Sequence, residues 1–91
     1  MDVTGDANAV IIHPDDNVVT VTVEIPADGT VVWGSGQIRA SMPIPYGHKV
    51  ALRALAAGDA VIKYGQLIGR AAGPIAAGEH IHTHNLSKED W

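Results

Sequence analysis

The chain has 91 residues and a formal net charge of −4, with ten acidic residues against six basic ones and only four aromatic residues. It therefore offers neither a basic stripe for phosphates nor a stacking platform for bases, and we expect no nucleic-acid partner. The absence of cysteine excludes disulfides, and the longest apolar stretches fall far short of the roughly 20 residues that span a bilayer, so we expect no membrane association.

The length predicts one domain over residues 1–91, because a second hydrophobic core could not be built from what remains after the first. The start of the sequence lacks the positive charge and apolar run of a secretion signal, so we expect a cytoplasmic protein. We expect an ordered core over about residues 7–86, with loosely ordered ends up to about Asp6 and from about Ser87.

The N-terminal third predicts two strands joined by a turn. Residues 9–13 are a short buried strand candidate, and residues 14–17 (Pro-Asp-Asp-Asn) favour a turn. Asp15, Asp16 and Asn17 could supply oxygen ligands to a hard cation, but at a turn they more often cap backbone groups. Residues 17–25 predict a half-buried strand, with one row of Val19, Val21, Val23 and Ile25 and an opposite row of Val18, Thr20, Thr22 and Glu24.

A weak internal repeat runs through the rest of the chain. Residues 55–64 match residues 75–84 at an offset of 20, and residues 25–32 form a looser third copy with one inserted residue. Each copy leads from an aliphatic residue into a glycine turn and a short strand, and Gly29, Gly58 and Gly78 suit a positive φ. Residues 47–57 predict a short strand or one helical turn. Together these signals predict a compact, irregular all-β fold.

The histidines near the C-terminus are the strongest chemical signal. If residues 80–84 continue as a strand, its period of two places His80, His82 and His84 on one face. Neighbouring members of this row lie roughly 6.5 to 7 Å apart, a span that two imidazoles can close around one metal ion. A two-histidine site completed by another ligand is easier to build than a three-histidine one, and a solvated polar strand face is the alternative.

Two further segments combine titratable side chains with a glycine. Residues 46–49 place His48 beside Lys49 after a proline-rich stretch, and residues 63–65 end the middle repeat copy with Lys63 and Tyr64. The repeat aligns Tyr64 with His84, which predicts that Lys63 and Tyr64 occupy a location equivalent to the histidine row. The alternative is two ordinary surface lysines and an aromatic residue at the edge of the core.

Taken in order, these segments resemble the SAF domain of the altronate and galactarate dehydratases, which also forms a separate small subunit in relatives such as sulfolactate sulfo-lyase. The resemblance covers about residues 9–86. The matching residues are His13-Pro14 with Asp16-Asn17-Val18, Ile44-Pro45 with Gly47-His48-Lys49-Val50-Ala51-Leu52, Gly58-Asp59, Ile62-Lys63-Tyr64-Gly65 with Ile68-Gly69, and Ile75 with Gly78-Glu79-His80-Ile81-His82 and His84-Asn85.

The resemblance implies a β-clip (SAF-like) fold and a lyase acting on a sugar acid or another hydroxy acid. It also implies a divalent metal ion (iron, manganese or magnesium) and a large catalytic lyase subunit, which we expect to be another polypeptide because the sequence ends at Trp91. Assembly into a homo-oligomer is compatible with this reading. Residues 34–42 match nothing specific, which leaves the hydroxy acid and the leaving group, water or sulfite, open.

Removal of the proton α to a carboxylate requires stabilisation of the developing enediolate charge and an acid or base. Together with the resemblance, this assigns catalytic roles to His48, Lys49, Lys63 and Tyr64, with His48 as the acid or base. Substrate binding falls to Lys49, Lys63 and Asn85, and metal binding to His80, His82 and His84. Two other readings are a non-catalytic module that orders and oligomerises the large subunit, and a domain that binds a sugar acid on its own.

Overall fold

The computed structural model describes residues 7–34 and 36–87, which form antiparallel strands and no helix. The strands are β2 (Ala9–Val10), β3 (Val18–Val21), β4 (Thr30–Trp33), β5 (Gly36–Arg39), β6 (Lys49–Ala51), β7 (Ala60–Lys63), β8 (Gln66–Ala71), β9 (His80–Ile81) and β10 (Leu86–Ser87). The all-β prediction is confirmed, and the arrangement is that of a SAF-like β-clip. The described residues contain no helix long and apolar enough to cross a membrane.

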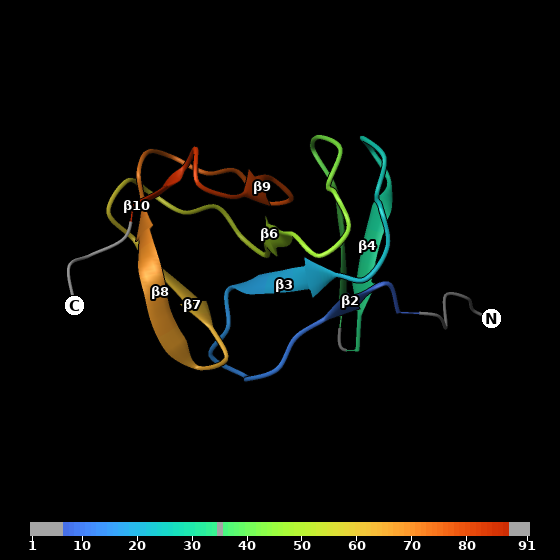
Figure 1. The fold of residues 1–91 in the computed structure, drawn as a ribbon, viewed down its shortest axis with the longest axis horizontal. Coiled ribbons are helices and arrows are strands. Elements are labelled where there is room, and N and C mark those ends of the chain that lie inside the picture. The colour runs from blue at the N-terminus through green and yellow to red at the C-terminus, as the bar shows by residue number, and fades with distance from the viewer. Residues whose placement is uncertain (1–6, 35, 88–91) are drawn as a thin grey trace.

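The strands form three small sheets (Figure 1). A central sheet in the order β2-β3-β6-β9 lies between the two-stranded β4-β5 sheet and a sheet in the order β10-β8-β7. Residues 47–57, which predicted a strand or a helical turn, contribute the strand β6. The expected loose ends lie largely outside the described residues, although Ser87 itself pairs with Arg70 in the β10-β8 ladder.

Two aliphatic cores flank the central sheet, and β3 contributes to both. Val19 and Val21 belong to the core on the β4-β5 side, and Val18 belongs to the core on the β7-β8 side. All three valines are 1% exposed. The prediction of a half-buried strand reaching residue 25 is wrong in two respects, because both faces of β3 are covered and the strand ends at Val21. Val23 is 49% exposed.

The repeat has four copies rather than three. In each, a buried aliphatic residue, here called the anchor, pairs with the anchor of another copy: Ile25 with Ile44, and Leu55 with Ile75. In both pairs the backbone N–H of each anchor donates to the carbonyl of the other at 2.8 to 2.9 Å. The copy at Ile44 leads directly into the turn that carries His48.

Each copy requires a left-handed residue three positions after its anchor. Gly47, Gly58 and Gly78 fill this position with φ of 82°, 86° and 84°, and Asp28 fills it in the first copy with φ of 66°. The expectation for Gly58 and Gly78 is confirmed. The expectation for Gly29 is wrong, because Asp28 takes the left-handed conformation, which aspartate tolerates better than most residues. No inserted residue is therefore needed to align the first copy.

Candidate histidine site

His48 lies four positions after its anchor, where two other copies have an acidic residue. Asp59 and Glu79 occupy this position, and each carboxylate accepts the backbone N–H of the alanine that follows the anchor, at 2.8 and 2.9 Å. In the copy of His48 the residue after the anchor is Pro45, which has no N–H to be capped. The imidazole of His48 is therefore released from this turn-closing role and points toward β9.

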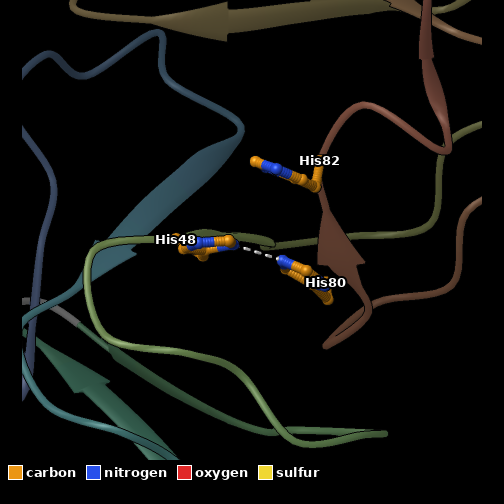
Figure 2. A group of neighbouring side chains, drawn as sticks. All are labelled: His48, His80 and His82. Atoms are coloured by element: carbon orange, nitrogen blue, oxygen red, sulfur yellow. Dashed lines mark hydrogen bonds between the residues drawn. The ribbon is translucent and has the colours of Figure 1, made fainter.

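His80 meets His48 across the β6-β9 pair. His80 lies opposite Val50 in the ladder, and its Nε2 is 2.8 Å from Nδ1 of His48 (Figure 2). The two ring centroids are 4.9 Å apart. One of these nitrogens must donate to the other, so a single proton lies between them. The side chain of His80 is half-buried, and its backbone N–H points to the sulfur of Met42 at 3.4 Å.

The expected strand over residues 80–84 ends at Ile81, because Asn85 closes a turn there. Its Oδ1 accepts the His82 N–H at 2.9 Å, and its Nδ2 donates to the His80 carbonyl at 2.8 Å. Local bonds of this kind compete with a strand ladder. The prediction of a regular row on one strand face is therefore wrong in its geometry.

The turn nevertheless keeps the imidazoles together. The ring of His82 stacks on that of His48 with centroids 4.5 Å apart, and the ring of His84 lies 5.5 Å from that of His80. Ring nitrogens of His48, His80 and His82 all lie within 4.8 Å of one another. We call His48, His80 and His82 the histidine cluster. His84 lies at its edge.

The surroundings of His80 and His82 favour their neutral forms. Burial lowers the pKa of His80 to about 4, and positive charge on the neighbouring His48, His84, His82 and Lys49 acts in the same direction. The pKa of His82 is also lowered, by desolvation and then by His48, Lys49 and His84. His80 is consequently neutral near pH 7, which is the form that binds a metal ion.

The donor set of the cluster fits some metals better than others. Two nitrogens bound to one ion at about 2.1 Å lie roughly 3 to 3.5 Å apart, so small side-chain rotations would bring all three nitrogens to one ion. Imidazole suits iron and zinc, whereas magnesium and manganese prefer carboxylate, carbonyl and water oxygens. Of the three metals that the family resemblance implies, iron suits these donor atoms best.

Lys49 lies beside the cluster but on the other face of the sheet. It pairs with Ile81 of β9 and with Thr20 of β3, whereas His80 pairs with Val50. Paired residues share a face, so the Lys49 side chain leaves the sheet on the Thr20 side. Its charge still reaches the cluster, where it lowers the pKa of His80 and His82.

Lys63 and Tyr64 lie apart from the histidine cluster, at the turn between β7 and β8. With Val10, Ile12, Asp16, Val18 and Thr20 they line a hollow of about 110 Å³ over β2 and β3. The cluster is at the opposite, β9 edge of the same sheet, roughly 10 to 15 Å away at the usual spacing of strands. Lys63 and Tyr64 are therefore equivalent to residues of the histidine row in the repeat alignment, but they do not join the histidine cluster.

The acidic turn at residues 15–17 caps backbone groups, as predicted for such a turn. Asp16 accepts the His13 N–H of its own turn and the Gly65 N–H of the turn between β7 and β8. The Asn17 side chain makes hydrogen bonds of 2.8 Å with the backbone of Ala60 and Ile62. Sequence reasoning missed that Asp16 reaches the Tyr64 turn. It also missed the fourth repeat copy, for which the spacing from Ile44 to Gly47 was the available signal.

Fold and site together define a small β-clip domain that presents a histidine cluster at the edge of its central sheet. Residues 7–89 match the family model described as the altronate/galactarate dehydratase SAF domain, and the chain belongs to this family. The chain is 51% identical over 55 residues to (2R)-sulfolactate sulfo-lyase subunit alpha of Paracoccus pantotrophus, covering 60% of this chain and 82% of that protein.

Two other relatives extend the comparison. The subunit alpha of (2R)-sulfolactate sulfo-lyase from Chromohalobacter salexigens is 38% identical over 89 residues, covering 89% of this chain and 95% of the relative. Altronate dehydratase of Escherichia coli is 44% identical over 75 residues, covering 81% of this chain but 15% of the relative. The similarity to the dehydratase thus concerns a small part of a much longer protein.

Proposed function

We propose that this chain is the small subunit of a lyase that eliminates sulfite from sulfolactate, together with a large catalytic subunit. The observation that carries the proposal is the match to sulfolactate sulfo-lyase subunit alpha over 95% of the length of the relative. The relative's designation as subunit alpha supports a second subunit. The three imidazoles of the histidine cluster form a group of titratable side chains of the kind that functional sites use.

In this proposal the histidine cluster faces the catalytic centre, which the large subunit completes. His48, His80 and His82 would hold a divalent metal ion, and iron is the candidate that the donor set favours. A bound metal ion would act as a Lewis acid and stabilise the enediolate that forms when the proton α to the carboxylate is removed. The low pKa of His80 keeps its ring nitrogen available as an acceptor at neutral pH.

The remaining residues of the chain bind substrate and move protons. Where His80 and His82 alone hold the metal ion, His48 is available as the acid or base of the elimination, and its Nδ1 lies 2.8 Å from Nε2 of His80. The ammonium groups of Lys49 and Lys63 would bind the acidic groups of the substrate. Because Lys63 and the Tyr64 hydroxyl lie roughly 10 to 15 Å from the cluster, farther than sulfolactate can span, they would bind a substrate molecule that approaches the catalytic centre rather than the one that reacts there. Asn85 holds the cluster turn, and its proposed contact with substrate requires a rearrangement of that turn.

Dehydration of a sugar acid such as altronate or galactarate is the second candidate reaction. It is favoured by the family match and by the 44% identity to altronate dehydratase. Both reactions remove a proton α to a carboxylate and expel a β-leaving group, so the same residues would serve either one. A module that only orders the large subunit is the non-enzymatic candidate.

The test is to replace His48, His80, His82 and His84 singly by Ala and to reconstitute each variant with the large subunit. Sulfite release from sulfolactate and dehydration of altronate are measured beside assembly by gel filtration. The proposal expects normal assembly with at least tenfold lower turnover for the three cluster variants. Gln37→Ala, an exposed change on β5, is the control. Parent rates in all variants would favour the ordering module instead.

A further inference from the structure

The turn between β7 and β8 holds a tyrosine in a conformation that tyrosine disfavours. Lys63 pairs with Gln66 across a two-residue turn, and both turn residues have a positive φ, 57° for Tyr64 and 73° for Gly65. Turns of this kind favour Asn-Gly, because asparagine and glycine tolerate the left-handed region. Tyrosine at the first position therefore stores backbone strain.

Burial of the aromatic ring does not explain this choice. Tyr64 is 55% exposed, and its ring lies under the ammonium group of Lys63, with Nζ 4.8 Å from the ring centroid. Neither the conformation of the turn nor packing in the core explains a tyrosine at this position, so its exposed side chain is the remaining candidate reason. Such strain is typical of sites that bind ligands, and it persists only where the surroundings fix the conformation.

Asp16 fixes the conformation of this turn. Its Oδ1 accepts the Gly65 N–H at 2.8 Å, and its Oδ2 accepts the His13 N–H at 3.1 Å and the Ile12 N–H at 3.4 Å. Asp16 is 7% exposed. Burial raises its pKa, but backbone hydrogen bonds, including one from Tyr64, outweigh this effect and lower the pKa below 3.8, so the carboxylate is charged at neutral pH.

On the other side of the turn, the ring of His13 lies against Gly65. A Cβ added to Gly65 would lie 2.8 Å from the ring of His13. The turn is thus held by a buried carboxylate on one side and by an imidazole on the other. Beside it lies the hollow of about 110 Å³, whose polar lining residues are Asp16, Thr20, Lys63 and Tyr64.

We propose that Asp16 is a positioning residue that holds the strained Tyr64 turn, so that Lys63 and Tyr64 bind the carboxylate or sulfonate of the substrate. This inference rests on the proposed function of Lys63 and Tyr64. An ammonium group and a phenol hydroxyl are donors suited to an anion, and the hollow is large enough for a group of a few heavy atoms. The oxygens of Asp16 are occupied by backbone donors, which partly offset the repulsion between its charge and an anion.

The decisive variant is Tyr64→Asn, because it relaxes the turn while it removes the side chain. We expect the melting temperature of the isolated chain to rise by about 4 °C. In the reconstituted enzyme we expect KM for sulfolactate to rise at least tenfold, with kcat changed less. A higher melting temperature with an unchanged KM would overturn the proposal, because the strain would then serve no binding role.

Asp16→Asn tests the positioning role directly. The amide keeps one acceptor oxygen but presents an N–H group to backbone donors. We expect a rise in KM similar to that of Tyr64→Asn, and the double variant should show little further loss, because both changes act on one feature. Additive losses would overturn the proposal. Asp59→Asn is the matched control, since Asp59 caps a turn of the same kind away from Lys63, and its KM should equal that of the parent.

Failure of the proposed function can be told apart from failure of this inference. If the parent complex turns over neither sulfolactate nor altronate, the proposed reaction is wrong. Calorimetric titration of sulfolactate into the parent complex and into the Asp16→Asn complex then decides the inference. At least tenfold weaker binding to the variant supports the positioning role. Equal binding, or no binding to the parent, overturns it.

Discussion

Truncation of Asn85 separates two roles that this residue could have. Its side chain is 9% exposed and makes two well-formed bonds, from the His82 N–H at 2.9 Å and to the His80 carbonyl at 2.8 Å. A third contact, to a carboxylate oxygen of Glu79, is longer at 3.4 Å. Asn85→Ala removes these bonds from the turn that connects two members of the histidine cluster.

The expected loss of stability follows from the number of hydrogen bonds that Asn85→Ala removes. Each hydrogen bond contributes about 1 kcal/mol net, so the two well-formed ones predict a loss of about 2 kcal/mol in the free energy of unfolding. For a domain of this size the melting temperature should fall by roughly 8 to 16 °C. His82 would no longer be held beside His48, and residues that orient metal ligands typically contribute 10- to 100-fold in metal affinity.

The assay combines thermal unfolding of the isolated chain with calorimetric titration of Fe²⁺ in the absence of oxygen. Asn17→Ala is the matched control, because Asn17 is 6% exposed and its side chain also makes two backbone bonds, both of 2.8 Å. The control should lose similar stability but keep its Fe²⁺ affinity. If Asn85→Ala left stability and Fe²⁺ affinity unchanged and only raised KM, a substrate contact would replace the structural role argued above.

Three further predictions follow from the same geometry. Because the pKa of His80 is lowered from 6.5 to about 4 on folding, stability that is present above pH 6.5 should be lost as the pH falls toward 4. The melting temperature should fall less between pH 7 and pH 4.5 for His80→Gln than for the parent chain. An equal fall in both would contradict this. Gly78→Ala should destabilise far more than Gly58→Ala in denaturant titrations, since both have a positive φ but only at Gly78 would a Cβ collide with the Arg39 carbonyl; equal losses would refute this. The purified chain alone should release no sulfite from sulfolactate at enzymatic rates, because a domain this small has little room for a core and a closed pocket, and ordinary turnover would disprove it.

The fold class could be predicted from sequence because its signals are local. The alternation of apolar residues indicates strands. A glycine three positions after Leu55 and after Ile75 indicates turns, and both kinds of element are present in the structure. The double burial of β3 could not be predicted in this way. Val18 is covered by strands that come much later in the chain, and tertiary packing of this kind leaves no local pattern.

The candidate site was predicted in its residue types but not in its arrangement. The histidines gather as expected, yet the expected strand row fails because the Asn85 side chain competes for the His82 N–H. An Asn three residues after His82 was the available signal. The separation of Lys63 from the cluster depends on the strand order of the central sheet, which the 20-residue repeat does not determine.

Differences between the four repeat copies indicate where the fold has been adapted to function. Two positions after the anchor, three copies have alanine, whereas the copy with His48 has Tyr46, which is 69% exposed. Proline follows the anchor in this copy and in the first copy, as Pro45 and Pro26, and both copies lack the acidic residue that caps an N–H in the other two. A turn that only connected strands would not need Tyr46, because alanine occupies this position in the other three copies. We therefore expect the exposed Tyr46 and the nearby His48 to lie where the proposed large subunit contacts this domain.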